Sequence, residues 1–452
     1  MVKKVVIIGG GAAGVDVLEL LLRAKGAAEE LEITLLKKEH EGFFSMCGLP
    51  FALQGLYSIK ELNIFEPEFY RAQGIDFRTG TEVTRINLEE GYVHLDSGEE
   101  LSYDELVIAT GSKPFIPPIE GTNREGVYTL SSREDGEKVE AALHAEETRN
   151  AVIIGGGWIG LQAAVAFSKK GIATRVVEKF PYLLPAILDA DMASLVKKRL
   201  DKEVTFMLGR TVHALRGEQR VTSVLVDEEE FPADIVLISA GVRPTVDIAR
   251  AAGIAIGESG GIVTDPALRV RKGNLYLDNV YALGDCVEVI DVVTHHPRLS
   301  QLASTALIQA RVVANNLRGN SASYETCLSP TVATISGLQI GSVGVITEVA
   351  GRYGIPIKSG SAIKYTKARF FPGRKLIVAK LLFEANSEKL IGAQLISEET
   401  VAERINELTL GIRAGITARD IWMRERCFDP SLTMVEDVLV DAALKAQSTI
   451  GS

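Results

Sequence analysis

Two copies of one short unit constrain the fold of this chain more than any other feature. Each copy is a run of apolar residues, a turn with the pattern GxGxxG and a stretch with helical spacing, and the turns occupy residues 9–14 and 155–160. In such a turn the first glycine permits a tight bend, the second lets the backbone approach a pyrophosphate, and the third lets helix and strand pack closely. One copy can be purely structural, but two copies in the same context predict two dinucleotide-binding α/β units.

The residues expected to hold the two dinucleotides lie in these turns and at the starts of the following helices. A helix N-terminus carries partial positive charge, which favours the binding of phosphate groups. The predicted ligands are Gly9, Gly11, Ala12, Ala13 and Gly14 in the first unit and Gly155, Gly157, Trp158, Ile159 and Gly160 in the second.

An acidic residue at the end of the second strand of such a unit selects the nucleotide. In the second unit, residues 174–177 are predicted to form a strand that ends at Glu178, roughly 20 residues after the turn. A carboxylate there accepts both ribose hydroxyls of NADH and repels the 2′-phosphate of NADPH. NADH is therefore favoured, although Arg175 and Lys179 leave some use of NADPH open.

The first unit is irregular at the same place. Its second strand, residues 33–36, is followed by Lys37, Lys38 and Glu39 instead of ending in an acidic residue. Glu39 is the preferred ribose ligand, and Lys37 facing a phosphate is the alternative. Two dinucleotides in one chain imply an electron path between them, with a nicotinamide in one unit and a flavin in the other.

Cys47 lies shortly after the first unit, and no second cysteine lies near it in the sequence. Two neighbouring thiols store electrons by closing a disulfide, whereas a single thiol must use a mixed disulfide, a sulfenic acid or a persulfide. The other cysteines, at positions 286, 327 and 427, are too scattered for a disulfide framework, and the six histidines lack metal-ligand spacing. No metal site is predicted.

Size and charge exclude several classes of protein. A chain of 452 residues is expected to form two or three domains. A net charge of −10 does not favour binding to nucleic acid, which is itself negatively charged. The first strand begins too early to leave room for a signal peptide, and no apolar run approaches the roughly 18 residues of a membrane span. We therefore expect a cytoplasmic protein without nucleic-acid or membrane partners.

Three further segments resemble those of the pyridine nucleotide-disulfide oxidoreductases. Residues 103–111 resemble the point where that family's chain crosses from the FAD to the NAD domain, residues 233–244 are their counterpart in the second unit, and residues 280–285 resemble the second FAD motif. The resemblance spans essentially the whole chain. It implies FAD contacts at Thr110, Gly111, Gly284, Asp285 and Ala303 and an NAD contact at Gly241, with Asp285 on the ribityl hydroxyls.

The resemblance implies an α/β fold with two Rossmann-like domains and a C-terminal α+β domain. The expected FAD domain is discontinuous, residues 1–115 and 246–325, and the expected NAD(P)H domain is residues 116–245. Residues 326–452 would form the dimerisation domain, which in the family completes the active site of the partner subunit, so a homodimer is implied. Its expected elements are strands at 332–335, 340–345, 377–383 and 390–396 and helices at 399–411 and 433–446, after a helix at 303–317 whose start points at the flavin.

Around Cys47 the chain resembles the single-cysteine branch of this family, which contains NADH peroxidase, NADH oxidase, coenzyme A-disulfide reductase and persulfide reductases. The resemblance places Cys47 beside the flavin at a helix start, where the thiolate form is favoured. The peroxidase and the water-forming oxidase carry a histidine where this chain has Ala12. Since loss of a proton-transfer group typically costs about 10²–10⁴ in rate, efficient reduction of peroxide or of oxygen to water is not expected.

Coenzyme A is a candidate ligand. Arg23 matches a basic position that family members use near its phosphates, and Ser45, Lys60 and Arg71 are further candidates. The coenzyme A-disulfide reductases also place two tyrosines of the partner subunit over the cysteine, but the matching segments here, 370–373 and 426–430, contain phenylalanine. Loss of these phenols favours persulfide or polysulfide substrates, whose leaving groups are easier. Cys427, beside the second missing tyrosine, is a candidate redox thiol or a packed residue.

The preferred function is an FAD-dependent NAD(P)H:sulfur reductase with Cys47 as the catalytic residue. Its acceptor would be coenzyme A persulfide, polysulfide or coenzyme A disulfide. Three alternatives stay open: an NADH oxidase that forms peroxide at the flavin, a redox-responsive binding flavoprotein similar to apoptosis-inducing factor, and a reductase for a small electron-carrier protein.

Overall fold

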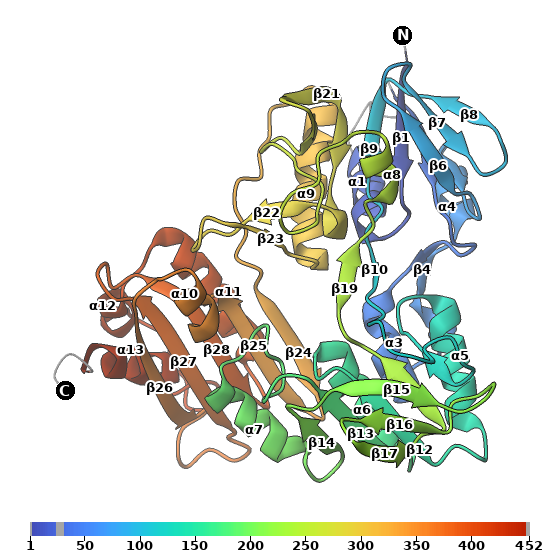
Figure 1. The fold of residues 1–452 in the computed structure, drawn as a ribbon. Helices are drawn as coiled ribbons and strands as arrows, with labels where there is room; N and C mark the ends of the chain where they lie inside the picture. The colour runs from blue at the N-terminus through green and yellow to red at the C-terminus, as the bar shows by residue number, and fades with distance from the viewer. Residues whose placement is uncertain (1, 24–30, 449–452) are drawn as a thin grey trace.

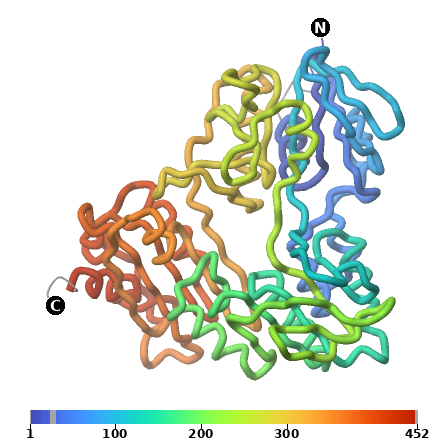
Figure 2. Tube along the Cα trace, viewed as in Figure 1, coloured from blue at the N-terminus to red at the C-terminus, as the bar shows by residue number. Residues whose placement is uncertain are grey.

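The computed structural model describes residues 2–23 and 31–448. The chain forms two units built on parallel sheets and a third domain built on an antiparallel sheet (Figure 1). The N-terminal segment and the segment around residues 250–320 lie together, while the residues between them form the second unit (Figure 2). The first unit is therefore assembled from two separate stretches of sequence.

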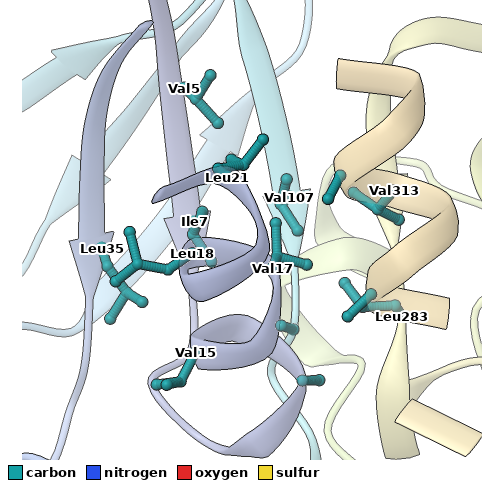
Figure 3. Close-up of a cluster of buried hydrophobic side chains, with 14 of the residues drawn as sticks. Val5, Ile7, Val15, Val17, Leu18, Leu21, Leu35, Val107, Leu283 and Val313 are labelled. Carbon is teal, nitrogen blue, oxygen red and sulfur yellow. The ribbon is translucent and has the colours of Figure 1, made fainter. Parts of the chain in front are cut away.

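The first unit contains a six-stranded sheet of order β20-β21-β9-β1-β2-β5. Its strands are β1 (Lys3–Ile8), β2 (Leu31–Leu36), β5 (Asp76–Arg78), β9 (Glu105–Ile108), β20 (Arg269–Lys272) and β21 (Leu275–Ala282). Helices α1 (Ala12–Arg23) and α9 (Ala303–Leu317) pack on one another through an apolar core (Figure 3). In that core Val17 and Leu18 of α1 and Val313 of α9 are buried. The helix expected at 303–317 is confirmed.

The second unit is a parallel five-stranded sheet of order β11-β18-β12-β13-β14. Its strands are β11 (Val127–Tyr128), β12 (Asn150–Ile154), β13 (Ala173–Glu178), β14 (Thr205–Leu208) and β18 (Ile235–Ile238), and helix α6 (Trp158–Lys169) follows β12. Strands β10 (Ser112–Pro114) and β19 (Val242–Pro244) pair antiparallel where the chain passes between the first two units (Figure 1). This pairing brings the two segments recognised in the sequence, 103–111 and 233–244, to one place.

The third domain is an antiparallel sheet of order β24-β25-β28-β27-β26. Its elements are β24 (Thr331–Ile335), β25 (Leu338–Gly344), β26 (Ile357–Tyr365), β27 (Leu376–Glu384), β28 (Leu390–Ser397), α11 (Val401–Ala414) and α13 (Val438–Ser448). Strand β26 was not predicted, because Gly360 and polar residues interrupt its apolar pattern. The glycine is required by packing, since a Cβ atom on Gly360 would lie 2.0 Å from the carbonyl oxygen of Ala442 in α13.

The last helix differs from its prediction, because α13 begins at Val438 instead of residue 433. The carboxylate of Asp437 accepts a hydrogen bond from the backbone N–H of Leu439 at 3.0 Å, which satisfies a donor of the first turn. The buried guanidinium of Arg404 donates to the same carboxylate at 2.7 Å, and residues 424–437, before the helix, form an irregular segment with a turn at 430–432.

The remaining elements complete the three regions. They are β3 (Phe43–Phe44), β4 (Asn63–Phe65), β6 (Val83–Asn87), β7 (Tyr92–Leu95), β8 (Glu100–Ser102), β15 (Val212–Arg216), β16 (Ser223–Val226), β17 (Glu229–Pro232), β22 (Glu288–Ile290) and β23 (Pro297–Leu299), with helices α3 (Leu49–Leu53), α4 (Pro67–Arg71), α5 (Arg133–His144), α7 (Ala190–Leu200), α8 (Asp247–Ala251), α10 (Thr347–Arg352) and α12 (Ala418–Met423). Of the helices in the described ranges, none has the length and apolar character that a membrane crossing needs.

Candidate active site

Of the three glycines at the GxGxxG positions of the first turn, two are required by packing and one is not. Gly9 has a φ of 112°, and a Cβ atom there would lie 2.1 Å from the carbonyl oxygen of Ala109. A Cβ atom on Gly14 would lie 2.0 Å from the carbonyl oxygen of Gly9. At Gly11, in contrast, no atom of the described residues lies within 4 Å of the Cβ position. Glycine at position 11 therefore leaves room for a ligand to approach the backbone.

The second turn repeats this geometry. Gly155 has a φ of 115°, and a Cβ atom there would lie 2.2 Å from the carbonyl oxygen of Ser239. A Cβ atom on Gly160 would lie 2.2 Å from the carbonyl oxygen of Gly155. Gly157 again faces a space free of described atoms within 4 Å, and α6 begins at the next residue, Trp158. Both turns thus form an open cradle at a helix N-terminus, where a dinucleotide pyrophosphate fits.

Glu178 ends strand β13 beside the second cradle, as predicted from the sequence. One carboxylate oxygen accepts the backbone N–H of Gly156 at 2.6 Å, and the other accepts that of Phe180 at 2.8 Å. Only 7% of the residue surface is exposed. The backbone therefore holds an acceptor group ready at the position where a ribose binds.

The corresponding position of the first unit is occupied by Lys37. The backbone N–H of Gly9 donates to the carbonyl oxygen of Leu36, just as that of Gly155 donates to the carbonyl oxygen of Val177. Lys37 and Glu178, the residues that come next, are therefore equivalent. Glu39 lies two residues further on and is exposed. A ribose contact by Glu39 stays a prediction, and its exposed position does not favour it.

The segment around Asp285 reaches the first cradle from a distant part of the sequence. Gly284 has a φ of 81°, and a Cβ atom there would lie 2.8 Å from the Cβ of Ala13. The Asp285 carboxylate accepts a hydrogen bond from Ser112 Oγ at 2.8 Å, and burial raises the pKa of this carboxyl. Ser112, whose hydroxyl orients Asp285, carries no signal in the sequence that singles it out.

The other candidate cofactor contacts lie where the two connecting strands begin and at the start of α9. Thr110 Oγ1 donates to the carbonyl oxygen of Thr245 at 2.6 Å, which ties the two crossings of the chain together. Gly111 and Gly241, with φ of 66° and 100°, have no described atoms within 4 Å of their Cβ positions. Ala303, in the first turn of α9, is exposed.

Cys47 is exposed and sits in a single turn of 3-10 helix, Met46–Gly48, directly before α3. None of the four cysteines, all within the described residues, forms a disulfide. The hydroxyl of Tyr57 donates to the carbonyl oxygen of Gly48 at 3.1 Å, and a Cβ atom on Gly48 would lie 2.2 Å from Leu62. The turn that carries the thiol is therefore fixed from both sides, in part by Tyr57, which the sequence did not single out.

The segment around Cys47 is docked on the second unit. Phe44, Leu49 and Leu53 are buried in one apolar cluster with Val139 of α5 and Phe167 of α6. This packing anchors the segment that carries the thiol on the second dinucleotide-binding unit.

The candidate coenzyme A ligands each make contacts with other parts of the protein. Arg23 pairs with Glu19 at 3.0 Å on its own helix. Arg71 donates to the carbonyl oxygen of Phe77 at 3.0 Å and pairs with Glu68 at 2.8 Å. Lys60 is exposed, and Ser45 donates its backbone N–H to Leu62. Their role in coenzyme A binding stays a prediction.

Cys427 lies in the irregular segment 424–437 of the third domain and is exposed. Phe428 and Phe370, which stand where the family's tyrosines were expected, are 50% and 79% exposed. Apolar rings so exposed in one chain fit a surface that another chain covers. Among the residues the structure describes, no group of three or more His, Cys, Asp or Glu could hold a metal ion.

The fold and the two cradles define a class: a protein with two Rossmann-like dinucleotide-binding domains and an antiparallel C-terminal domain. Residues 3–310 match the family described as pyridine nucleotide-disulphide oxidoreductase, and residues 330–438 match its dimerisation domain. The chain belongs to this family. The expected α/β fold is thereby confirmed, FAD and NAD(P)H are the implied cofactors, and the dimerisation domain supports a homodimer.

Similar proteins include oxidases and sulfur reductases. The chain is 34% identical to an NADH oxidase of Methanocaldococcus jannaschii, over 97% of this chain and 98% of that protein. It is 29% identical to an NAD(P)H coenzyme A polysulfide/persulfide reductase of Pyrococcus horikoshii, over 97% of both. The structure of an NAD-dependent persulfide reductase from A. fulgidus superposes with a TM-score of 0.94 at 31% identity, covering 99% of this chain and 83% of that one.

Gly11 and Gly157 face open space, and replacing each of them in turn tests which cofactor each turn binds. Gly11→Ala should weaken FAD binding and Gly157→Ala should weaken NADH binding, each by about 10-fold or more, because a methyl group would occupy space for the pyrophosphate. In neither variant would the added methyl group come close to another described residue across the fold, so the fold should be unaffected. Flavin content and NADH titration of the purified variants measure the two effects. Loss of both cofactors in one variant would contradict this assignment.

Proposed function

We propose that the protein is an FAD-dependent NADH:sulfur reductase in which Cys47 is the catalytic residue. The observation that carries the proposal is the place of this thiol. It is exposed, single, and held at the start of α3 by a segment that packs on the second dinucleotide-binding unit. A thiol so placed can exchange sulfur with a small molecule on its open side and receive electrons from the cofactor side.

The cofactor contacts follow the two cradles. Residues 1–115 and 246–325 would bind FAD, with Asp285 on the ribityl hydroxyls and the α9 start at Ala303 facing the flavin ring. Residues 116–245 would bind NADH, with Glu178 on the ribose. Bound FAD would take hydride from NADH and return an electron pair to the sulfur attached to Cys47.

The sulfur step follows ordinary thiolate exchange. The Cys47 thiolate attacks the outer sulfur of a persulfide RS–SH, forms a new S–S bond and releases the thiolate RS⁻. Two electrons then break the bond in Cys47–S–SH, regenerating the Cys47 thiolate and releasing HS⁻. With a disulfide acceptor the same two steps release two thiols. No proton donor beyond solvent is needed when the leaving group is sulfide or a thiolate of low basicity, which agrees with phenylalanine at positions 370 and 428.

Several observations support a sulfur acceptor. The relative from Pyrococcus horikoshii is described as acting on coenzyme A polysulfide or persulfide, and the A. fulgidus protein as a persulfide reductase. Ala12 at the first helix start cannot transfer protons to peroxide. Coenzyme A would bind through Arg23, Ser45, Lys60 and Arg71, and the dimerisation domain would bring Cys427 and Phe428 over the active site of the partner subunit.

An NADH oxidase that forms peroxide is the second candidate. The relative at 34% identity is an NADH oxidase, and such a reaction at the flavin would not use Cys47. The two functions predict different electron acceptors, so they can be separated directly.

The test compares acceptors at equal concentration with the FAD-loaded dimer. NADH oxidation is followed without oxygen in the presence of coenzyme A persulfide, coenzyme A disulfide, polysulfide or peroxide, and separately with oxygen alone. We expect coenzyme A persulfide or polysulfide to support turnover in the usual enzyme range, about 1–10³ per second, and oxygen or peroxide to support at most about a hundredth of it. If oxygen proves the best acceptor the protein is an oxidase, and if peroxide does it is a peroxidase; either result shows that the proposal is wrong.

A further inference from the structure

Lys37 and Glu178 hold the same position in the two repeats. Strand β1 pairs with β2 so that Ile8 faces Leu36, and β12 pairs with β13 so that Ile154 faces Val177. The next residues are Lys37 and Glu178. A Cβ atom on Gly10 would lie 2.9 Å from the Cβ of Lys37, and one on Gly156 would lie 3.3 Å from the Cβ of Glu178. The fold therefore places a cation in the first unit where the second has a carboxylate.

The two side chains offer a ribose opposite chemistry. A carboxylate only accepts hydrogen bonds, whereas an ammonium group only donates them and has three donors. Lys37 is 5% exposed, about as deeply buried as Glu178. The two residues that follow Lys37 in the sequence do not supply a buried acceptor in its place. Lys38 pairs with Glu82, 2.8 Å away, and Glu39 is exposed.

Lys37 also contacts the segment that carries the catalytic thiol. Its ammonium group donates to the carbonyl oxygen of Gly42 at 2.6 Å and lies 3.5 Å from a carboxylate oxygen of Glu41. Gly42 is tightly enclosed, since a Cβ atom there would lie 2.0 Å from the carbonyl oxygen of Phe65. Strand β3 begins at the next residue and leads directly into the turn of Cys47. One side chain thus lies between the nucleotide crevice and the cysteine segment.

We propose that Lys37 is a positioning residue that donates one hydrogen bond to a ribose hydroxyl oxygen of FAD and another to Gly42. Occupation of the adenosine end of the first cradle then fixes the segment that carries Cys47. The part that concerns Cys47 rests on the proposed function, but the contact with the nucleotide does not.

The first measurement is FAD affinity. Lys37→Met keeps an apolar stem against Gly10 and removes all three donors. Because a hydrogen bond to a charged group contributes about 1.5–3 kcal/mol, the dissociation constant for FAD, measured by flavin fluorescence on the deflavinated protein, should rise about 10- to 100-fold. Lys38→Met, which changes the neighbouring exposed lysine, should leave it unchanged. Lys37→Glu restores an acceptor for the ribose and should bind FAD more tightly than Lys37→Met.

The second measurement is the coupling to Cys47. ADP occupies only the adenosine end of the cradle, so any effect it has on the thiol must pass through the protein. In the wild type and in Lys38→Met, saturating ADP should change the rate of Cys47 alkylation by iodoacetamide, followed by mass spectrometry of its peptide, about 5-fold. In Lys37→Met and Lys37→Glu the effect should be lost.

The outcomes test the role of Lys37 separately from the proposed sulfur reductase function. Unchanged FAD affinity in Lys37→Met, or an ADP effect equal to that of the wild type in both Lys37 variants, would overturn the inference about Lys37. Neither result depends on the acceptor, so the inference can fail while sulfur reduction stands. NADH binding to the second unit, measured on each variant, shows that the fold is intact.

Discussion

Replacing Cys47 by serine should lower NADH oxidation with coenzyme A persulfide or polysulfide by at least about 10³-fold. A serine hydroxyl is not ionised at neutral pH and cannot form the S–S bond through which the substrate sulfur would be held. The side chain is exposed and nearly isosteric, so folding and flavin content should not change. Anaerobic stopped-flow reduction of the bound flavin by NADH should proceed at the wild-type rate, because that step does not use the thiol.

Cys427→Ser is the matched control for this experiment. Both thiols are exposed, but Cys427 lies in the third domain, whereas the segment that carries Cys47 packs on the second dinucleotide-binding unit. If Cys427 is packed rather than redox-active, its variant should retain sulfur reduction. Loss of activity in both variants would make Cys427 a second redox thiol. Sulfur reduction that survives in Cys47→Ser would refute the proposed mechanism, and an oxygen-dependent rate that remains unchanged would then favour the oxidase.

The parts of the fold that sequence predicts best are those whose causes are local. Gly14 and Gly160 must be glycine because their Cβ atoms would collide with the carbonyl oxygens of Gly9 and Gly155 in the same turn. Glycine spacing that results from such collisions within one turn can be recognised in a single amino-acid sequence. The boundaries of the helix at 303–317 were also predicted, because its apolar spacing is uninterrupted.

The parts that escaped prediction depend on distant residues. Gly360 weakens the sequence signal of β26, yet it is there because α13 crosses the strand at Ala442. At the candidate site, the acidic character of Glu39 favoured it as a ribose ligand, but strand register puts Lys37 at that position. Nothing in a lysine at a strand end reveals that its ammonium group will reach Gly42. Tyr57 and Ser112 act through contacts with Gly48 and Asp285 that no local spacing encodes.

The segment that carries Cys427 depends on another distant contact, the buried ion pair between Arg404 and Asp437. The guanidinium and carboxylate are 2.7 Å apart, and their side chains are 8% and 3% exposed. Arg426 lies 3.3 Å from the same carboxylate. The pair ties the segment 424–437 to α11. It therefore helps to fix the part of the chain that carries Cys427 and Phe428.

Removing Arg404 takes from the buried Asp437 carboxylate its shortest charged contact and leaves it the longer one to Arg426. We expect Arg404→Met to lower the free energy of unfolding of the third domain by about 3–5 kcal/mol. Urea unfolding followed by the fluorescence of Trp422, in a Trp158→Phe background, measures this domain because Trp422 bonds to Gln447 of α13 at 2.8 Å. Arg352→Met, which breaks an exposed pair with Glu348, should cost less than about 1 kcal/mol.

The loss of stability in Arg404→Met should depend on pH through the ionisation of Asp437. Although burial raises the pKa of its carboxyl, the hydrogen bond and charge of Arg404 outweigh burial and hold the pKa below its ordinary value in the folded protein. The pair therefore stabilises the fold above the unfolded pKa of about 3.9, and this contribution is lost as the pH falls through the lower folded value. The difference between wild type and Arg404→Met should be full at pH 7 and shrink below about pH 4. Adding Asp437→Asn removes the buried charge that has lost its main partner and should recover much of the stability at pH 7. A difference that persists unchanged at low pH would show that Arg404 stabilises the domain by packing alone.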